Sequence, residues 1–501
     1  MATSIKKTVK AYNGQVIDDY FVGQDVQFIV SPVNKSVYSC ILNLTDITKG
    51  SNSNKYYKIQ CVENLKKDTF ILIRYGRIGD SGVVKVERLD RYVCINKFEL
   101  QFKTKTGNKW GQPFFPQPGK YFLADLDSEI DPIVDTPALR SQSDIDEEKV
   151  DPKLNEFIKL ITNQSFMKNT LTQFNIDVQK LPLGKISHAQ VQKAYSILSQ
   201  IEKQIALPYD ILPSQKVIDE LEKLSSSFYT LFPCNVGRAK PPLIDSKKMV
   251  SEKANLLDNI SQMVTGVNIL SATQKNKIST ICQELNTEFK LLDSNTQIYK
   301  LLTEYLHVSN TEFHKFKFDI TAIFELDRPK ERDAYEKYSS NLGNKNLLFH
   351  GTRISNLMGI LKNGLVVDPS KLGINVFTTG KMFGMGLYFA NCCSKSLQYC
   401  AADQSGGNAC LFVSEVALGK VMPLKDGNYS LTAKTLPKDY HSVQGLGKNS
   451  YNKIYMYNDI YIPRGQPITL AKENNLYYDE FIIYHEEQIS LKYIIQLKIK
   501  S

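Results

Sequence analysis

The chain has 501 residues, of which 42% are hydrophobic and 23% are charged, and its formal net charge is +10. This composition is typical of a soluble globular protein with about two to four domains, and no apolar run is long enough to span a membrane. The opening residues, MATSIKKTVKAYNG, lack the apolar core of a secretory signal. Nine cysteines without CxxC or zinc-finger spacing predict reduced thiols in an intracellular compartment and no metal site.

The front of the chain, from about residue 13 to residue 125, has the pattern of an antiparallel β module. Three segments have strand length and composition: 37–42, 56–61 and 69–74. Glycines then interrupt the pattern in RYGRIGDSG, which predicts a tight turn rich in backbone amides. The spacing of Phe98 and Phe102 predicts a helix, followed by a loop to Trp110.

This β module is basic, with nineteen Lys and Arg against eleven Asp and Glu between Met1 and Asp125. Such a surplus favours a polyanionic partner. A basic, glycine-rich turn beside Tyr75 and Arg77 suits a phosphate backbone with a stacked sugar or base. Two plainer interpretations stay open: a basic surface that is only solvated, and a turn that has no function.

The next segment, 126–150, reverses the charge. Between Asp127 and Lys149, eight Asp and Glu face only Arg140 and Lys149, and prolines and serines are interspersed. This composition predicts a linker with little packing of its own. Its carboxylates and serines are candidate modification acceptors, although a solvated tether is the favoured interpretation.

Residues 151–292 have helical apolar spacing. Asp151 is placed to cap the first helix, and Ser187 with Gln190 has the spacing of a capping box before a second one. No catalytic side chains converge here. The pattern therefore predicts an all-α bundle with an interaction or regulatory role.

From residue 293 to residue 501 strands predominate. The clearest are 347–353, 409–418, 477–484 and 489–499, and a short helix closed by glycine is expected over 354–364. Many strands without alternating long helices predict an α+β fold with a mainly antiparallel sheet. No G-x-G-x-x-G opens a helix after a strand, so a Rossmann dinucleotide site is not indicated.

Within this part, the stretch MFGMGLYFANCCSKSLQYC (382–400) predicts a glycine turn, a short strand through Tyr388, and a helix starting near Ser394. Ser396 and Tyr399, three residues apart, would share a face of that helix. Such a slot, a hydroxyl between two phenol rings, suits a flat aromatic ring with an amide. Taken alone, these residues are more simply read as a packed strand–helix unit.

Three ordered motifs, LLFHGTR, MFGMGLYFANCCSKSLQYC and YYDEFIIY, together resemble the His-Tyr-Glu signature of ADP-ribosyltransferases of the poly(ADP-ribose) polymerase type. RYGRIGDSG resembles the WGR domain of the DNA-dependent members, in which a Trp-Gly-Arg turn meets the end of broken DNA; here Tyr75 replaces the Trp, while Gly76 and Arg77 match. LPLGKISHAQVQKAYSIL is similar to the helical regulatory domain of the same family.

The resemblance implies an α+β multidomain protein. Its parts are a small β-rich WGR-like DNA-binding module (1–125), an acidic linker (126–150), an all-α helical regulatory domain (151–292) and a mainly antiparallel β ADP-ribosyltransferase domain (293–501). In that family the regulatory helices form a lid over the dinucleotide site that is relieved when DNA binds.

The resemblance also assigns roles, with NAD+ as substrate and no metal cofactor. The implied catalytic residues are Glu480, His350, Tyr388 and Lys395. The implied NAD-binding residues are His350, Gly351, Tyr388, Ser396 and Tyr399. The implied DNA-binding residues are Tyr75, Gly76 and Arg77. Lys381 departs from the family, where an aromatic residue often stands near the acceptor site.

The resulting hypothesis is a DNA-break-activated NAD+ ADP-ribosyltransferase that modifies proteins, itself included, and releases nicotinamide. Its expected partners are broken duplex DNA and acceptor proteins, with no membrane, and its expected place is the nucleus, in the DNA damage response. Two alternatives remain: a DNA-end-binding scaffold with weak or no catalysis, and a mono-ADP-ribosyltransferase.

Overall fold

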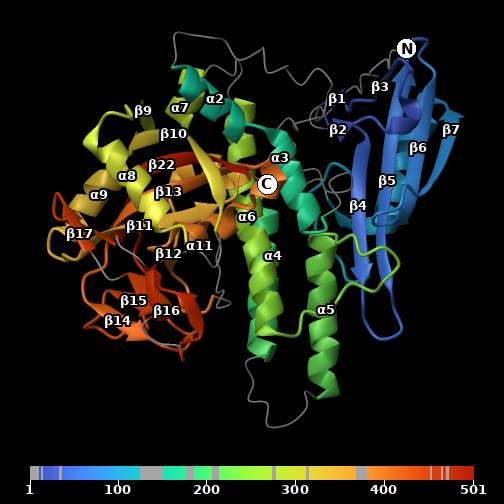
Figure 1. The fold of residues 1–501 in the computed structure, drawn as a ribbon. Helices are drawn as coiled ribbons and strands as arrows, with labels where there is room; N and C mark the ends of the chain where they lie inside the picture. The colour runs from blue at the N-terminus through green and yellow to red at the C-terminus, as the bar shows by residue number, and fades with distance from the viewer. Residues whose placement is uncertain are drawn as a thin grey trace. The chain divides into compact units, whose positions relative to one another are not determined.

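A computed structural model describes residues 11–12, 15–32, 36–124, 151–176, 186–205, 214–272, 278–311, 315–367, 381–451, 454–463, 467–469 and 473–500 (Figure 1). The chain forms two compact units. The first draws on Met1–Asp144 and Thr170–Gln274, and the second on Ile145–Asn169, Lys275–Gly373 and Thr378–Ser501. The predicted linker, 126–150, lies outside the described residues. Among the described helices, none is long and apolar enough to cross a bilayer.

In the first unit, an antiparallel sheet in the order β7-β6-β5-β4-β8, with β3 also paired to β5, forms the front module (Figure 1). Its elements are β1 (Ala11–Tyr12), β2 (Gln15–Val16), the 3-10 helix η1 (Asp19–Phe21), β3 (Val26–Phe28), β4 (Ser39–Asp46), β5 (Ser53–Asn64), β6 (Thr69–Arg77), β7 (Val83–Leu89), α1 (Arg91–Thr106) and β8 (Phe122–Leu123). The predicted strands and the helix are therefore present.

One face of this sheet is covered by α1. Asp90 caps the helix by accepting a hydrogen bond from the backbone N–H of Tyr92 at 2.9 Å, and Gly107 ends it in a left-handed conformation. Phe98 and Phe102 are buried against the sheet, and the Trp110 ring meets both edge-on at 4.8 and 4.9 Å between ring centroids. Aromatic contacts of this kind explain why the helix and the following loop stay on the sheet.

The helices of the first unit pack on one another and on the front module. They are α4 (His188–Ile205), α5 (Gln215–Leu231) and α6 (Lys247–Ala272), and α3 (Gln164–Gln173) is divided between the two units. α5 lies along β4, where Ser226 Oγ accepts from Ile47 N at 2.9 Å and Thr230 Oγ1 accepts from Thr45 N at 3.0 Å. Serine and threonine thus satisfy backbone groups of the sheet edge from a neighbouring helix.

The capping box predicted for α4 is only half formed. Ser187 Oγ accepts from Gln190 N at 3.1 Å, as expected. The Gln190 amide, however, donates to Leu231 O at 2.7 Å instead of returning to the start of its own helix. A buried carbonyl at the end of α5 competes for that amide, so the side chain joins two helices.

Across its described residues, the second unit contains three sheets and surrounding helices (Figure 1). Its helices are α2 (Pro152–Ile161), α7 (Ile278–Glu284), α8 (Gln297–Val308), α9 (Pro329–Ser339), η5 (Ile354–Asn356), α10 (Leu357–Asn363), α11 (Cys393–Leu397), η7 (Gln398–Cys400), η8 (Ala402–Ser405) and η9 (Glu486–Gln488). Its strands are β9 (Glu288–Leu291), β10 (Lys317–Asp327), β11 (Lys345–Thr352), β12 (Leu387–Phe389), β13 (Asn408–Ala417), β14 (Val421–Leu424), β15 (Ser442–Gly445), β16 (Gly447–Tyr451), β17 (Ile454–Tyr457), β18 (Ile460–Pro463), β19 (Pro467–Thr469), β20 (Leu476–Tyr478), β21 (Glu480–Ile483) and β22 (Ile489–Lys500).

The largest sheet has the order β17-β18-β11-β13-β22-β10-β9, and a second sheet has the order β12-β21-β15-β14. Among the described strands, the parallel pairs are β11–β18, β14–β15 and β16–β20, and the other pairs are antiparallel. The fold class is therefore confirmed: a β-rich module, a helical part, and a mainly antiparallel β domain. The single strand predicted over 477–484 is wrong, because Asp479 divides it into β20 and β21, which belong to different sheets.

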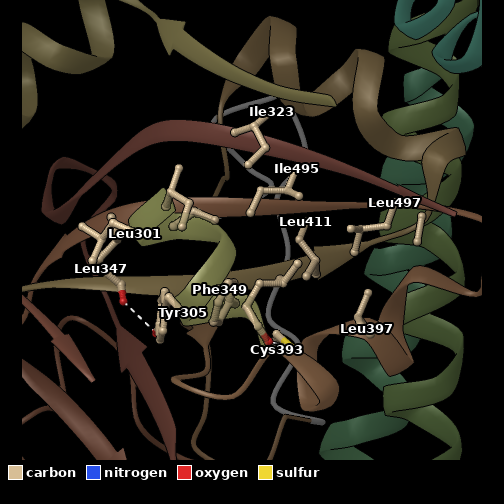
Figure 2. Packing of buried hydrophobic residues seen from close by; sticks show 14 of the residues in the cluster. Leu301, Tyr305, Ile323, Leu347, Phe349, Cys393, Leu397, Leu411, Ile495 and Leu497 are labelled. Carbon is tan, nitrogen blue, oxygen red and sulfur yellow. Dashed lines mark hydrogen bonds between the residues drawn. The ribbon is translucent and has the colours of Figure 1, made fainter. Parts of the chain in front are cut away.

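The core of this unit lies between α8 and the large sheet (Figure 2). Leu411 and Ile495 extend from adjacent strands into the cluster. Tyr305 of α8 stacks on Phe349 at 4.4 Å between ring centroids, and its hydroxyl donates to Leu347 O at 3.0 Å. One tyrosine thereby fixes the helix on β11, the strand that leads into the candidate site.

Replacing Tyr305 with Phe tests this attachment. The ring contacts remain, but the buried carbonyl of Leu347 loses a donor, so we expect the folded state to lose about 1–2 kcal/mol. Differential scanning calorimetry should show the melting temperature of the second unit fall by roughly 2–4 °C per kcal/mol. Tyr429→Phe, at an exposed tyrosine, is the control and should leave it unchanged; equal melting of the two variants would contradict the assignment.

Candidate active site

The turn before β12 is built around two glycines and the Tyr388 hydroxyl. Gly384 has φ +73°, and a Cβ there would lie 2.0 Å from Leu431 O, so no other residue fits. The Tyr388 hydroxyl accepts from Phe383 N at 2.9 Å and donates to Gly384 O at 2.8 Å. Both hydrogen-bonding positions of the phenol are occupied by the turn, so the ring is held in one place.

His350, near the end of β11, lies against the same strand. Its Nδ1 atom is 2.9 Å from Tyr388 O, and because a carbonyl only accepts, Nδ1 carries the proton and Nε2 is an acceptor. Burial lowers the pKa of His350 to about 4; the Tyr388 carbonyl opposes this, and the charge of Lys381 adds to it. The imidazole is therefore neutral at neutral pH.

Gly351 and Ser396 meet where α11 crosses β11. A Cβ on Gly351 would lie 1.8 Å from Ser396 O, so the approach of the two backbones requires glycine. Phe349 exchanges both backbone hydrogen bonds with Ala390, at 2.8 and 3.0 Å. Because backbone groups alternate along a strand, the N–H and C=O of Gly351, two residues later, point in the same direction as those of Phe349, away from β13.

Glu480 begins β21 and is paired with Lys395 of α11. Lys395 Nζ is 2.8 Å from Glu480 Oε1, and each side chain is only 13% exposed. The same ammonium donates to Tyr478 O at 3.2 Å. The register pairs Tyr388 with Ile482, and Glu480 is two residues from Ile482, so the phenol and the carboxylate lie on one face of the β12–β21 pair.

The residue before the carboxylate, Asp479, fixes the break between β20 and β21. It is buried; its Oδ1 accepts from Gly447 N at 2.8 Å and its Oδ2 from Ser450 Oγ at 2.6 Å. Sequence reasoning did not single out Asp479. The available signal was a second carboxylate beside Glu480 in a run that is otherwise apolar and aromatic, because a buried carboxylate needs hydrogen-bond donors.

Tyr388 and Tyr399 differ in burial. Burial raises the pKa of Tyr388, and the charges of Tyr484, Glu480 and Tyr399 raise it further, which places these groups close to the phenol. Tyr399, in η7, is 62% exposed, whereas Ser396 is buried and its hydroxyl donates to Phe349 O at 3.4 Å. The Ser396 hydroxyl is therefore enclosed by the protein, whereas the Tyr399 ring is open to solvent.

The predicted helix start near Ser394 is one residue late. α11 begins at Cys393, and its N-cap residue, Cys392, makes no side-chain cap. The Ser394 hydroxyl lies inside the helix and is 2.9 Å from Thr311 Oγ1. Because the Ser394 hydroxyl is hydrogen-bonded to this buried threonine, it does not cap the start of the helix.

The residues predicted to bind DNA end strand β6 in the first unit. The Tyr75 ring is stacked on Tyr57 at 5.8 Å between centroids, and Lys85 Nζ is 5.8 Å from the Tyr75 ring. A Cβ on Gly76 would lie 2.8 Å from Gly82 Cα, so the strand and the returning turn require glycine here.

The Arg77 guanidinium contacts the segment after α5. Its Nε and Nη2 atoms donate to Gly237 O and Ala239 O, both at 2.6 Å, and Nη1 donates to Asn52 O at 3.0 Å. Sequence reasoning did not foresee these contacts with carbonyls of the helical part. Among the described residues, no group of three or more His, Cys, Asp or Glu side chains is arranged to hold a metal ion.

The fold is that of a multidomain α+β protein in which His350, Tyr388 and Glu480 lie on neighbouring strands, and comparison with known proteins agrees with this architecture. The model described as WGR domain matches residues 38–114, that of the poly(ADP-ribose) polymerase regulatory domain matches 148–289, and that of the poly(ADP-ribose) polymerase catalytic domain matches 296–499.

Individual relatives cover nearly the whole chain. A poly [ADP-ribose] polymerase of Sarcophaga peregrina is 32% identical over 507 residues, 98% of this chain and 49% of the relative. Poly [ADP-ribose] polymerase 1 of Danio rerio is 32% identical over 93% of this chain and 45% of its own length. Poly [ADP-ribose] polymerase 2 of Arabidopsis thaliana is 30% identical over 97% of this chain and 77% of its own length.

The chain belongs to the poly(ADP-ribose) polymerase family. It spans about half the length of the first two of these relatives and about three quarters of the third.

The neutral state of His350 predicts an acid-sensitive fold. With a pKa of about 4 in the folded protein and about 6.5 when unfolded, the histidine takes up a proton more readily after unfolding. The contribution of the neutral His350 to the free energy of unfolding is therefore fully present above about pH 6.5. It decreases as the pH falls toward 4, by up to about 3 kcal/mol. Chemical denaturation at pH 7.5 and pH 5 should show this loss in the wild type and a smaller loss in His350→Gln; identical losses would contradict the assignment.

Proposed function

We propose that this chain is an NAD+-dependent ADP-ribosyltransferase that transfers ADP-ribose to proteins, itself included, releases nicotinamide, and is activated by broken duplex DNA. The observation that carries the proposal is the enclosed Lys395–Glu480 pair on the same face as Tyr388, beside His350 and Gly351. Metal plays no part in the proposed chemistry.

Nicotinamide binding is assigned to Gly351 and Ser396 for the carboxamide and to Tyr388 and Tyr399 for the ring. Support comes from the direction of the Gly351 backbone groups and from the buried Ser396 hydroxyl beside them. An amide and a peptide group are complementary donors and acceptors. The proposal is also supported by the anchored phenol of Tyr388 and by the exposed ring of Tyr399, since both are aromatic surfaces on which a flat ring can stack.

His350 is assigned to the adenosine ribose of NAD+. A neutral imidazole whose Nδ1–H is held by Tyr388 O presents Nε2 as an acceptor to a sugar hydroxyl. Protonation would remove that acceptor, so its low pKa is consistent with this role.

Glu480 is assigned to the nicotinamide ribose and to the acceptor. As the C–N glycosidic bond breaks, nicotinamide leaves as a neutral molecule, so the leaving group needs no general acid, and positive charge develops on the ribose. A preorganised carboxylate stabilises that charge and then accepts the proton of the attacking hydroxyl. Lys395 is a positioning residue, because its ammonium fixes the carboxylate while Oε2 remains for the substrate.

Glu480→Gln tests this assignment. The amide keeps the shape of the side chain but loses the negative charge, so we expect transfer of ADP-ribose from labelled NAD+ to fall by about 100-fold or more, with elongation most affected. NAD+ binding measured by calorimetry should change little. Glu336→Gln, at an exposed glutamate of α9, is the control; polymer formed by Glu480→Gln at the wild-type rate would refute the role.

DNA activation is assigned to the front module, with salt-sensitive binding, and nuclear residence in the DNA damage response follows from it. Tyr75, with its stacked partner Tyr57 and neighbouring Lys85, supports contact with a DNA end. Arg77 supports a link between DNA binding and the regulatory helices, since it donates hydrogen bonds to the carbonyls of Gly237 and Ala239 in the helical part. The domain boundaries 1–125, 126–150, 151–292 and 293–501 are part of this proposal.

Two other functions fit the same domains. A DNA-end-binding scaffold without catalysis is disfavoured by the intact set of His350, Tyr388 and Glu480 and by their geometry. A mono-ADP-ribosyltransferase differs only in product length. Lys381, whose Nζ lies 5.7 Å from the Tyr388 ring, leaves that choice to experiment.

Activation is tested with labelled NAD+ in the presence and absence of a blunt DNA duplex, with products resolved by length. We expect the duplex to stimulate labelling on the order of 10-fold or more. Tyr75→Ala should weaken DNA binding by about 1–3 kcal/mol by removing a stacking ring, whereas Tyr92→Ala, at an exposed tyrosine of the same module, should not. Labelling that does not depend on DNA would contradict the proposed activation but not the proposed transferase activity. No labelling at all would favour the DNA-end-binding scaffold.

A further inference from the structure

The second unit contains a cavity of about 850 Å³ that shares no residue with the candidate active site. Its walls come from α2, α7, β9, the start of α9, the end of α10, η9 and the start of β22. Apolar side chains line much of it, among them Leu154, Ile278, Phe289 and Ile489. This volume and lining are typical of sites for small organic molecules.

A buried guanidinium lies in the cavity wall. Arg328 is 7% exposed; its Nε donates to Glu331 Oε2 at 2.9 Å, and Nη1 donates to Thr287 Oγ1 at 2.8 Å and to Leu361 O. Within the described residues, Nη2 has no hydrogen-bond acceptor. Gly364, also in the wall, would bring a Cβ within 3.4 Å of Nη2, so the atom lies at that side of the cavity. Nη2 is not enclosed by the protein, so it can donate to the oxygen of a molecule bound in the cavity.

The charges of the wall disfavour an anionic ligand. The lining contains Arg328, Lys330 and Lys362 against four glutamates: Glu288, Glu331, Glu486 and Glu487. The other oxygen of Glu331 accepts from Leu491 N at 2.7 Å, and Lys362 pairs with Glu284 at 3.1 Å. Since the surroundings are slightly negative overall, an uncharged acceptor is preferred over a carboxylate.

We propose that this cavity binds a small, neutral, largely apolar molecule whose carbonyl oxygen accepts a hydrogen bond from Arg328 Nη2. Its walls join two parts of the sequence: α2, α7 and β9 fall within or at the edge of the regulatory match, and α9, α10 and β22 within the catalytic match. The Phe157 ring of α2 already contacts Phe289 and Phe324 of the sheet at 5.7 and 5.2 Å between centroids. A ligand there would strengthen the attachment of these helices.

A regulatory consequence rests on the proposed function. If DNA acts by releasing regulatory helices, a molecule that holds α7 against α9 and α10 raises the DNA concentration needed for activation. Binding and regulation are separate outcomes, because binding is measured without turnover.

Cys282 provides the probe. It lines the cavity and is partly exposed, whereas the other eight cysteines are buried, and burial raises its pKa to about 11. At alkaline pH its thiolate attacks the disulfide of a cysteamine-capped probe, forms the new S–S bond and releases cysteamine. Two probes of equal size are compared on the full chain, one ending in an aryl ketone and one in the corresponding ethyl-substituted ring.

Intact mass under competing thiol should show roughly tenfold preference for the ketone probe, the effect of one added hydrogen bond. Ala334→Leu, which narrows the cavity from α9, should suppress labelling by both probes, and Arg328→Lys should remove the preference. Cys282→Ser is the labelling control. Equal labelling by the two probes, or labelling unaffected by Ala334→Leu, would overturn the site.

The labelled protein then gives the regulatory result. The duplex concentration for half-maximal nicotinamide release should rise severalfold after ketone labelling, and an unchanged value would overturn the regulation while the binding site stands. A wild-type protein that does not consume NAD+ would refute the proposed function and leave the labelling result intact.

Discussion

The candidate site depends on α11, a helix of five residues held between two sheets. Lys395 extends from it to Glu480 at the start of β21, and the next residue, Ser396, brings its backbone against Gly351 of β11. The two charges of an ion pair with little solvent exposure must stay close together, because either one without its partner would be a costly buried charge. The helix therefore fixes the spacing between the carboxylate and the strand that carries His350.

Two buried hydrogen-bond arrangements support that spacing from outside the candidate site. Asp479 ends β20 and directs the chain into β21, and the Tyr388 hydroxyl closes the glycine turn on which its own strand depends. In both cases a side-chain polar group is hydrogen-bonded to a neighbouring segment: the Tyr388 hydroxyl to backbone atoms of the turn, and the Asp479 carboxylate to the Gly447 backbone and the Ser450 hydroxyl. Such networks hold a functional group by many partners, so its position does not rely on one contact.

Much of the fold could be predicted from local pattern, because α1 and the strands of the front module have caps, glycines and apolar spacing that agree. The motif residues His350, Tyr388 and Glu480 could also be selected from sequence. What escaped prediction depends on partners far along the chain. Gln190 serves α5 rather than its own helix, Ser394 bonds Thr311, and Asp479 divides an apparently continuous strand. Tertiary hydrogen bonds override local preference at such positions.

The hydrogen bonds between β4 and α5 bear on how this protein can be divided. Thr45 and Ile47 rely on hydroxyls of Thr230 and Ser226, and Asn54 donates to Cys234 O at 2.8 Å. The WGR-like module is contiguous in sequence, yet part of its sheet edge is completed by residues nearly two hundred positions later. A fragment ending before the acidic segment would expose apolar and polar groups that the whole chain conceals, so solubility trials are better begun from a piece that retains α5.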